Sequence, residues 1–155
     1  MTPWQIMPLT AGDIDPLLEI EQALFPKPWN QTSYLQELAY EGSHNFCVKP
    51  ADSTEHPPVI AYVCFRMIFD EMHLLKIGVA RHWQNKGIAT WLLQHSIRQA
   101  AEKGATAAYL EVRVSNIPAI SFYHKLGFTL IGKRPRYYPE TGEDALVLKK
   151  YIYST

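Results

Sequence analysis

The chain contains the stretch His73-Leu74-Leu75-Lys76-Ile77-Gly78-Val79 and, after a short turn, Gln84-Asn85-Lys86-Gly87-Ile88-Ala89. The first stretch has the apolar character of a strand, and the second leads into an amphipathic helix. A glycine-containing loop between a strand and a helix leaves backbone N–H groups unpaired at the positive end of the helix dipole. Such a loop predicts a seat for a phosphate group, with Lys86 adding a cation at its rim.

Apolar residues continue at helical spacing after this loop, namely Ile88, Leu92, Leu93, Ile97 and Ala100. Gly104 is expected to end the helix. Gly87 lets a phosphate approach the backbone, because a side chain there would hold the phosphate away. By itself, the Gln-x-x-Gly-x-Ala pattern fits an ordinary strand-to-helix turn equally well. The sequence has no P-loop and no dinucleotide-binding glycine pattern, which argues against nucleoside triphosphate and NAD as ligands.

The composition is that of an ordinary globular protein. The 155 residues, 47% hydrophobic and 19% charged, suit one domain spanning residues 1–155. Fifteen basic and fifteen acidic residues give a formal net charge of zero, so the chain lacks a global field for nucleic acid. We therefore expect no direct binding of nucleic acid.

Cys47 and Cys64 lie in apolar, strand-like runs without metal-ligand spacing. We expect buried thiols in a reducing compartment, with a disulfide as the alternative. The amino-terminal segment from Met1 to Pro8 lacks the pattern of a secretory leader, and no run of eighteen apolar residues occurs. These features predict a cytoplasmic protein that does not associate with membranes.

Strands and helices are expected in an order that indicates a mixed sheet. The predicted strands are Trp4–Leu9, Asn45–Lys49, Val59–Phe69, Glu71–Val79, Ala107–Val112, Phe128–Lys133 and Asp144–Lys150. A first helix is expected to carry Ile14, Leu17, Leu18 and Ile20, with caps offered by Thr10 to Asp13. Further helices begin at Thr32 or Ser33, after Gly87 and at about Ile117, and a hairpin-like loop is expected over Pro50–Pro58. Strands first in hairpins and then separated by helices imply an α/β (α+β) fold with helices on both faces of the sheet.

Gly78 lies inside a predicted strand. A glycine there indicates a bulge or a close backbone approach, and a merely tolerated glycine is the alternative. A ligand can enter a sheet where two neighbouring parallel strands diverge. Gly78 is thus a candidate for such a place.

Several segments follow one another in the order found in one enzyme family. They are the Glu71–Val79 strand, the Gln84–Ala89 loop with its helix, Leu110-Glu111-Val112-Arg113, Ser115-Asn116 and Phe122-Tyr123-His124-Lys125-Leu126-Gly127-Phe128. In this order the chain resembles the GNAT acyl-CoA-dependent N-acetyltransferases. Within them it resembles the RimI subfamily, the ribosomal-protein N-terminal alanine acetyltransferases. Further support comes from Phe25-Pro26-Lys27-Pro28-Trp29 and from Arg136-Tyr137-Tyr138-Pro139 with Glu143-Asp144-Ala145-Leu146-Val147.

The chain departs from the family pattern in two places. Ala89 stands where many relatives have a second glycine, and Lys76-Ile77-Gly78 differs from the commoner residues of that strand. A small methyl group at Ala89 is compatible with a phosphate seat. Neither departure touches the residues that the resemblance implies for acid and base catalysis.

The resemblance implies a mixed, mostly antiparallel central sheet of about seven strands, in which a splayed pair of parallel strands forms the acyl-CoA cleft. It also implies acetyl-CoA as co-substrate, with its pantetheine arm along the backbone of Ile77, Gly78 and Val79. Its pyrophosphate would lie on the backbone amides of Asn85, Lys86, Gly87, Ile88, Ala89 and Thr90. A strand N–H near Gly78 or Val79 would stabilise the oxyanion that develops on the acetyl group.

Acyl transfer to an amine needs a path for the amine proton and a proton for the departing thiolate. By resemblance, Glu111 would be the general base, directly or through a water, and Tyr123 the general acid. From the residues alone, the alternative for Glu111 is an exposed strand-end carboxylate paired with Arg113. Tyr123 lies on the apolar stripe of a predicted helix, and the alternative for it is a core tyrosine.

The expected acceptor is the α-amine of a protein or peptide. A carboxylate of ordinary pKa, about 4.3, is a weak base toward an ammonium near 8, a gap of about 5 kcal/mol. At pH 7 about one-tenth of an α-amine with a pKa of about 8 is neutral, whereas the neutral fraction of a lysine with a pKa of about 10.4 is far smaller. A weak base therefore favours an α-amine as the acceptor. The subfamily implies an alanine-starting ribosomal protein. The alternatives are a small amine, such as a polyamine or an aminoglycoside, and a noncatalytic acyl-CoA sensor.

Four residues are expected to bind the acceptor: Trp29, Arg136, Tyr137 and Tyr138. The last three follow Arg134 in a late loop that mixes cations with aromatic faces, which suits a peptide segment. A solvated hairpin is the alternative reading of that loop. For oligomeric state, we expect a monomer or a weak dimer.

Asn116 precedes a predicted helix that has Pro118 in its first turn. It is expected to cap that helix, to contact coenzyme A, or to do both. His73 lies near Glu71, but no second histidine or cysteine stands at ligand spacing. We therefore expect no metal.

Overall fold

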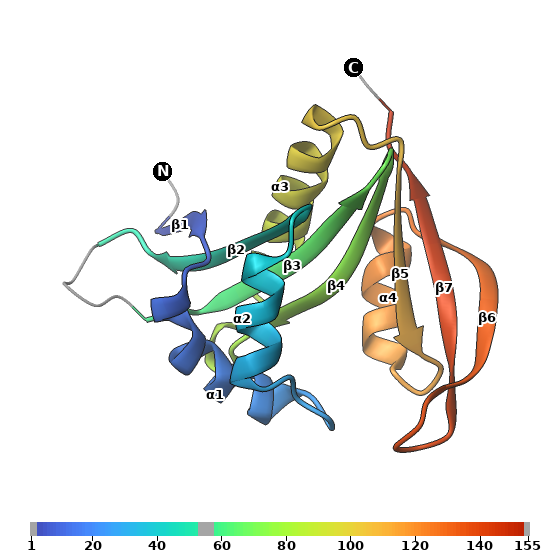
Figure 1. Ribbon diagram of the computed structural model, residues 1–155, viewed down its shortest axis with the longest axis horizontal. Helices are drawn as coiled ribbons and strands as arrows, with labels where there is room; N and C mark the ends of the chain where they lie inside the picture. Colours follow the sequence, from blue (N-terminus) through green and yellow to red (C-terminus); the bar gives the residue numbers. More distant parts are fainter. Residues whose placement is uncertain (1–2, 53–57, 154–155) are drawn as a thin grey trace. The chain divides into compact units, whose positions relative to one another are not determined.

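The computed structural model describes residues 3–52 and 58–153 (Figure 1). The strands are β1 (Trp4–Pro8), β2 (Ser43–Pro50), β3 (Ala61–Ile68), β4 (Glu71–Val79), β5 (Ala107–Arg113), β6 (Thr129–Tyr138) and β7 (Glu143–Tyr151). The helices are α1 (Ile14–Leu24), α2 (Gln31–Ala39), α3 (Ile88–Glu102) and α4 (Ile117–Lys125), with short 3-10 helices η1 (Ala11–Asp13) and η2 (Arg81–Trp83). The middle of the predicted loop over Pro50–Pro58 lies outside the described residues.

The seven strands form a sheet in the order β1-β2-β3-β4-β5-β7-β6. The pairs β1/β2, β2/β3, β5/β7 and β6/β7 are antiparallel, whereas β4 and β5 are parallel. The parallel pair is in register over Glu71–His73 and Ala107–Tyr109, at the start of both strands. The prediction of a mixed, mostly antiparallel sheet with one parallel pair is confirmed.

The chain divides into two compact units. The first unit is Met1–Arg66 with Lys76–Ser96, and the second is Met67–Leu75 with Ile97–Thr155. Thus the end of β4 and the start of α3 belong to the first unit, while β5, α4, β6 and β7 belong to the second.

In the first unit, α1 and α3 lie on opposite faces of the sheet. Successive side chains of a strand point to opposite faces. In β2, Cys47 Sγ lies 3.9 Å from the carboxylate of Asp13, which precedes α1. Its neighbour Phe46 instead packs edge-on against His95 of α3, with ring centroids 5.2 Å apart. Cys47 and Cys64 are both free and buried, as predicted.

The observed elements differ from the predicted ones in two informative places. Helix α2 begins at Gln31, because Asn30 caps it by accepting a 2.8 Å hydrogen bond from Ser33 N. Strand β6 continues to Tyr138, so the predicted late loop that carries Arg136 is part of a strand. Its pairing with β7 is irregular there, and Arg136 has a φ of 52°. A bulge breaks the alternation by which strands are identified, which explains the wrong prediction.

Two buried carboxylates of the first unit are paired with cations. Asp13 Oδ1 lies 2.7 Å from Lys49 Nζ, and Glu37 accepts hydrogen bonds of 2.9 and 2.7 Å from Arg66. Burial opposes ionisation of both carboxylates. Hydrogen bonds from Lys49 and Thr10 to Asp13, and from Arg66 and Ser43 to Glu37, outweigh that cost and hold each pKa below its usual value.

We expect this pairing to make the fold sensitive to acid. A depressed pKa in the folded state adds stability above the unfolded-state pKa of about 4, and this stability is lost as the pH falls through the folded-state pKa. Glu37→Gln should therefore flatten the fall in the free energy of unfolding between pH 6 and pH 3, measured by urea denaturation. Glu19→Gln, at an exposed position of α1, is the control and should leave the slope unchanged. Equal slopes for the two variants would contradict this account.

Candidate functional site

The loop from Gln84 to Gly87 joins η2 to α3 and is exposed. Gln84 Nε2 donates a 3.0 Å hydrogen bond to the carbonyl of Val79, which fastens the loop to the end of β4. Asn85 and Gly87 have φ values of 62° and 81°, in the left-handed region. A Cβ built on Gly87 meets no atom within 4 Å, so the space above this glycine is open.

Helix α3 begins directly after this loop. Trp91 N donates a 3.1 Å hydrogen bond to the carbonyl of Gly87. The N–H groups of Ile88, Ala89 and Thr90 come before that first helical hydrogen bond, at the positive end of the helix dipole. With Lys86 exposed beside them, these residues of the first unit can hold an anion. The predicted strand, glycine loop and helix are all present, and their role in binding coenzyme A is a proposal.

Gly78 is buried in β4 and lies against a side chain. A Cβ on Gly78 would lie 2.8 Å from Tyr62 Oη and 2.9 Å from Tyr62 Cζ. The prediction named a bulge or a close backbone approach. The tyrosine ring of β3 is the group that comes close, and it leaves no room for a methyl group.

Gly78→Ala is expected to destabilise the protein by about 1–3 kcal/mol, the usual cost of forcing an extra carbon into a packed interior. Gly132→Ala is the matched control, because Gly132 also lies in a strand and its Cβ would meet nothing within 4 Å. Thermal and urea unfolding of both variants measure the difference. A Gly78→Ala protein as stable as Gly132→Ala would show that Tyr62 moves aside freely.

In the second unit, Glu111 lies on β5 opposite Val147 of β7. Its side chain is 25% exposed, and Arg134 Nε of β6 lies 3.5 Å from its Oε1. Arg113 does not take this role: its guanidinium pairs with Glu140 and Glu143 and stacks on the ring of Tyr138 at 3.9 Å. The alternative in which Glu111 is neutralised by Arg113 is therefore wrong, and Arg134 is its observed partner.

Tyr123 lies on α4 and is 8% exposed. Its ring packs edge-on against Phe122 and Phe128, with centroids 5.2 and 5.6 Å away. Burial, with a smaller contribution from Tyr138, raises the pKa of Tyr123. The hydroxyl therefore holds its proton at neutral pH. Tyr123 is both a packed tyrosine, as the alternative held, and a potential proton donor.

Tyr138 is a half-buried tyrosine at the end of β6 in the same unit. Burial raises its pKa to about 12, against the opposing effect of Arg113, and Tyr137 and Glu111 contribute in the same direction as burial. Glu111 of β5, Tyr123 of α4 and Tyr138 of β6 all belong to the second unit. Tyr137 is 44% exposed and lies at a right angle to Tyr138, with ring centroids 5.1 Å apart.

The remaining predicted site residues lie as follows. Asn116 caps α4, since its Oδ1 accepts a 3.3 Å hydrogen bond from Ala119 N. Arg136 is exposed, and its N–H donates to Asp144 Oδ1 at 2.9 Å. His73 lies 3.2 Å from Glu71 Oε1 and stacks on Tyr109. Among residues 3–52 and 58–153, no group of three His, Cys, Asp or Glu side chains is placed to hold a metal ion.

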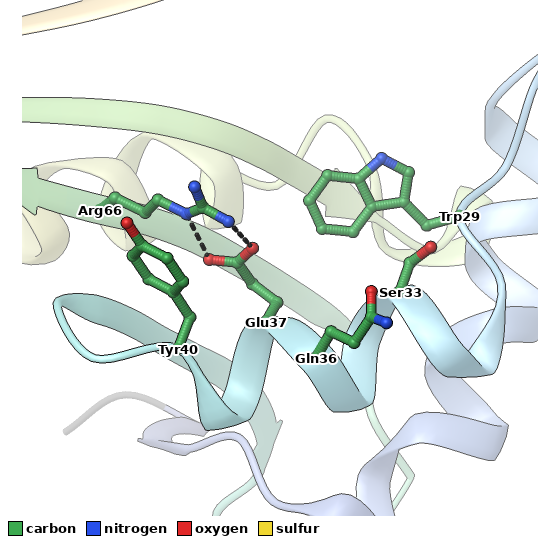
Figure 2. Close-up of a pocket in the computed structure, with 6 residues that line it drawn as sticks. All are labelled: Trp29, Ser33, Gln36, Glu37, Tyr40 and Arg66. Carbon is green, nitrogen blue, oxygen red and sulfur yellow. Dashed lines mark hydrogen bonds and ion pairs between the residues drawn. The ribbon is translucent and has the colours of Figure 1, made fainter.

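Trp29 forms one end of a surface pocket of about 340 Å³ in the first unit. Figure 2 shows Ser33 and Gln36 of α2 beside it, and the ion pair of Glu37 with Arg66 beyond them. Tyr40 at the far end carries the Arg66 guanidinium over its ring, at 3.9 Å from the centroid. Neither Glu111 nor Tyr123 lines this pocket. Within the described part of the chain, no helix combines the length and the apolar character needed to cross a bilayer.

Sequence reasoning missed two features of these units. One is the pairing of Arg134 with Glu111, which depends on the register of β6. The other is the contact of Lys76 with a buried glutamate, Glu21, at 2.7 Å. A signal for the second was present, because Glu21 lies at i+7 from Ile14 and i+4 from Leu17, on the apolar stripe of α1.

Comparisons with known proteins identify the family of the chain. The model of the acetyltransferase (GNAT) family matches residues 14–128. The ribosomal protein bS18-alanine N-acetyltransferase of Escherichia coli strain K12 is 31% identical over 145 residues, covering 92% of this chain and 94% of that protein. The enzyme of the same name from Haemophilus ducreyi is 32% identical over 143 residues, covering 90% of this chain and 94% of its own.

Solved structures of acetyltransferases have the same fold. The crystal structure of the ribosomal-protein-S18-alanine N-acetyltransferase from Escherichia coli aligns with a TM-score of 0.85 at 29% identity, covering 98% of this chain and 96% of that one. Arabidopsis thaliana NAA60 in complex with acetyl-CoA shares the fold, with a TM-score of 0.84 at 17% identity, covering 96% of this chain and 98% of that one. The chain therefore belongs to the GNAT family of acetyltransferases.

Proposed function

We propose that this protein transfers the acetyl group of acetyl-CoA to the N-terminal α-amine of a protein, with an alanine-starting ribosomal protein as the acceptor. The observation that carries this proposal is the similarity, over nearly the whole of both chains, to enzymes named for acetylating the alanine of ribosomal protein bS18. Residues 1–155 act as one acetyltransferase domain in this proposal. The family match over residues 14–128 supports that part, because it includes segments of both units.

The first unit supplies the binding groups for acetyl-CoA. The open space above Gly87 and the N–H groups at the start of α3 fit a pyrophosphate, which would lie on the amides from Asn85 to Thr90. The backbone from Ile77 to Val79 pairs with the pantetheine arm. Lys86 adds a positive charge at the rim, and Asn116 of the second unit is a further contact for coenzyme A.

The second unit supplies the groups for proton transfer. Glu111 takes the proton that the amine loses as its nitrogen bonds to the acetyl carbon, directly or through one water. Tyr123 gives its proton to the sulfur as the thioester bond breaks. A strand N–H near Gly78 or Val79 donates to the oxygen that carries negative charge in the transition state.

Four side chains are proposed to bind the acceptor peptide: Trp29, Arg136, Tyr137 and Tyr138. The exposed ring of Tyr137 and the half-buried ring of Tyr138 lie at a right angle and offer aromatic edges and hydroxyl groups to a peptide. Arg136 offers guanidinium donors that suit peptide carbonyls. Trp29 offers a half-buried indole from the segment between α1 and α2.

The proposal is tested by incubating the pure protein with acetyl-CoA and short peptides that differ only in their first residue. Spermidine and an aminoglycoside complete the panel, and the release of coenzyme A is followed. Turnover that is fastest on the alanine-starting peptide is expected. Turnover on the small amines alone would replace the proposal with acetylation of a small molecule. Tight binding of acetyl-CoA without any turnover would replace it with an acyl-CoA sensor.

A further inference from the structure

Glu21 is a fully buried carboxylate on α1. Its Oε1 accepts hydrogen bonds from Tyr34 Oη at 2.9 Å and Tyr62 Oη at 2.5 Å. Its Oε2 accepts one from the backbone N–H of Trp29 at 2.8 Å and lies 2.7 Å from Lys76 Nζ. A carboxylate has about four acceptor sites, and these four donors fill them.

The four donors come from four different segments of the first unit. Tyr34 belongs to α2, Tyr62 to β3 and Lys76 to β4, while Trp29 lies between α1 and α2. Glu21 is thus the shared partner of α2, β3, β4 and the segment between α1 and α2. Losing it would leave buried donors unsatisfied at once, which is costly.

The segment between α1 and α2 is held through both its backbone and its side chains. Its backbone is fixed by the bond from Trp29 N to Glu21. Two aromatic rings of this segment lie against the Lys76 ammonium group. The ammonium nitrogen is 3.8 Å from the centroid of the Phe25 ring and 5.4 Å from the centroid of the Trp29 ring. The Lys76 side chain is 12% exposed, so this cation has little solvent to compete with the rings and with Glu21.

The same cluster reaches the strand proposed to hold acetyl-CoA. Lys76 directly precedes Ile77, and the Tyr62 hydroxyl that donates to Glu21 is the group that lies against Gly78. The contacts around Glu21 therefore extend to both Lys76 and Gly78 of β4.

We infer that Glu21 is a positioning residue that fixes the acceptor-binding segment around Trp29 against the cofactor-binding end of β4. This inference rests on the proposed function. Glu21 does not touch the reacting atoms in this account. It fixes the Trp29 backbone in place before the acceptor arrives, which lowers the ordering cost of binding a peptide there.

The first unit contains a matched control for this inference. Glu37 is also a buried carboxylate paired with a cation, Arg66. Its other hydrogen-bond partner is Ser43. Figure 2 shows Glu37 of α2 paired with Arg66 of β3, and none of these bonds reaches the Trp29 backbone. Removing this pair deletes another buried carboxylate together with its cation, here an Arg66 side chain that is 32% exposed, and leaves the bond to Trp29 N in place.

The test compares Glu21→Leu/Lys76→Met with Glu37→Leu/Arg66→Met. Each double variant replaces both charged side chains of the ion pair by apolar ones, so that no unpaired charge is left buried. Hydrogen exchange at the Trp29 amide is measured first. We expect it to accelerate about tenfold or more in the Glu21 variant, as the loss of one hydrogen bond to a carboxylate predicts, and to stay unchanged in the Glu37 variant.

Kinetics with an alanine-starting peptide are measured next. The Glu21 variant should raise the peptide KM about tenfold, while kcat and the Kd for acetyl-CoA stay within about twofold. Glu21→Gln/Lys76→Met should rescue the peptide KM, because the amide oxygen still accepts from Trp29 N. A merely structural role would lower kcat and weaken both substrates together, and the glutamine would then give no selective rescue.

Two outcomes would overturn the inference. One is an unchanged rate of hydrogen exchange at the Trp29 amide in the Glu21 variant. The other is faster exchange in that variant with an unchanged peptide KM. Where the leucine variant does not fold, Glu21→Asp keeps the charge and withdraws the carboxylate by one methylene, and it is read in the same way. If the wild-type protein acetylates no peptide, the proposed function itself fails and the inference falls with it. If the wild type does and all variants match it, only the inference fails.

Discussion

Tyr123→Phe is expected to lower kcat about 100-fold or more and to leave the affinity for acetyl-CoA within about twofold of the wild-type value. The substitution removes one hydroxyl and keeps the ring that packs between Phe122 and Phe128. Because burial raises the pKa of Tyr123, the wild-type hydroxyl carries its proton at every pH at which the assay is run. The loss should therefore be nearly independent of pH between 6 and 9.

The measurement is steady-state turnover on an alanine-starting peptide, with acetyl-CoA binding followed by calorimetry. Tyr109→Phe is the matched control, since Tyr109 is a half-buried tyrosine of the same unit that stacks on His73. It should turn over like the wild type. Unchanged turnover of Tyr123→Phe would remove this residue from the role of acid and leave it as a core tyrosine.

Glu111→Gln is expected to lower kcat/KM about 100-fold at pH 7 and to steepen its dependence on pH. Without a base, only the neutral amine reacts, so the rate should rise about tenfold per pH unit below the amine pKa of about 8. The variant should therefore approach the wild type as the pH rises toward 9. The side chain keeps its size, and Arg134 loses its 3.5 Å charged partner at a position that is itself exposed.

A pH profile of kcat/KM from pH 6 to pH 9 checks this prediction. Glu71→Gln is the control, because Glu71 is an exposed carboxylate of the same unit whose contact is with His73. Its profile should follow that of the wild type. A Glu111→Gln profile parallel to the wild-type curve would count against a base at this position.

Helices and strands whose apolar residues recur at regular spacing were predictable from the sequence. The helical spacing from Ile88 onward located α3, and the strand before it located β4, because periodic burial leaves a periodic pattern. The candidate phosphate seat followed, since it depends on a strand, a glycine and a helix start that are close in sequence. Gly87, with its φ of 81°, is where the prediction needed a glycine.

Contacts between distant segments were not predictable in the same way. Arg134 meets Glu111 because β7 pairs with both β5 and β6, and Arg136 lies where the pairing of β6 with β7 is irregular. Glu21 and Lys76 are far apart in sequence, and their pairing requires α1 to lie over β4. The need for glycine at position 78 was expected, but the tyrosine that imposes it was not.

The most direct test of the central claim is the position at which the acetyl group is attached. The pure protein is incubated with acetyl-CoA and an alanine-starting peptide that also contains an internal lysine, and the product is sequenced by fragmentation mass spectrometry. We predict a single acetyl group on the α-amine of the first residue, and no product from the same peptide with a blocked N-terminus. Acetylation of the lysine alone, or of neither amine, would contradict N-terminal acetyl transfer.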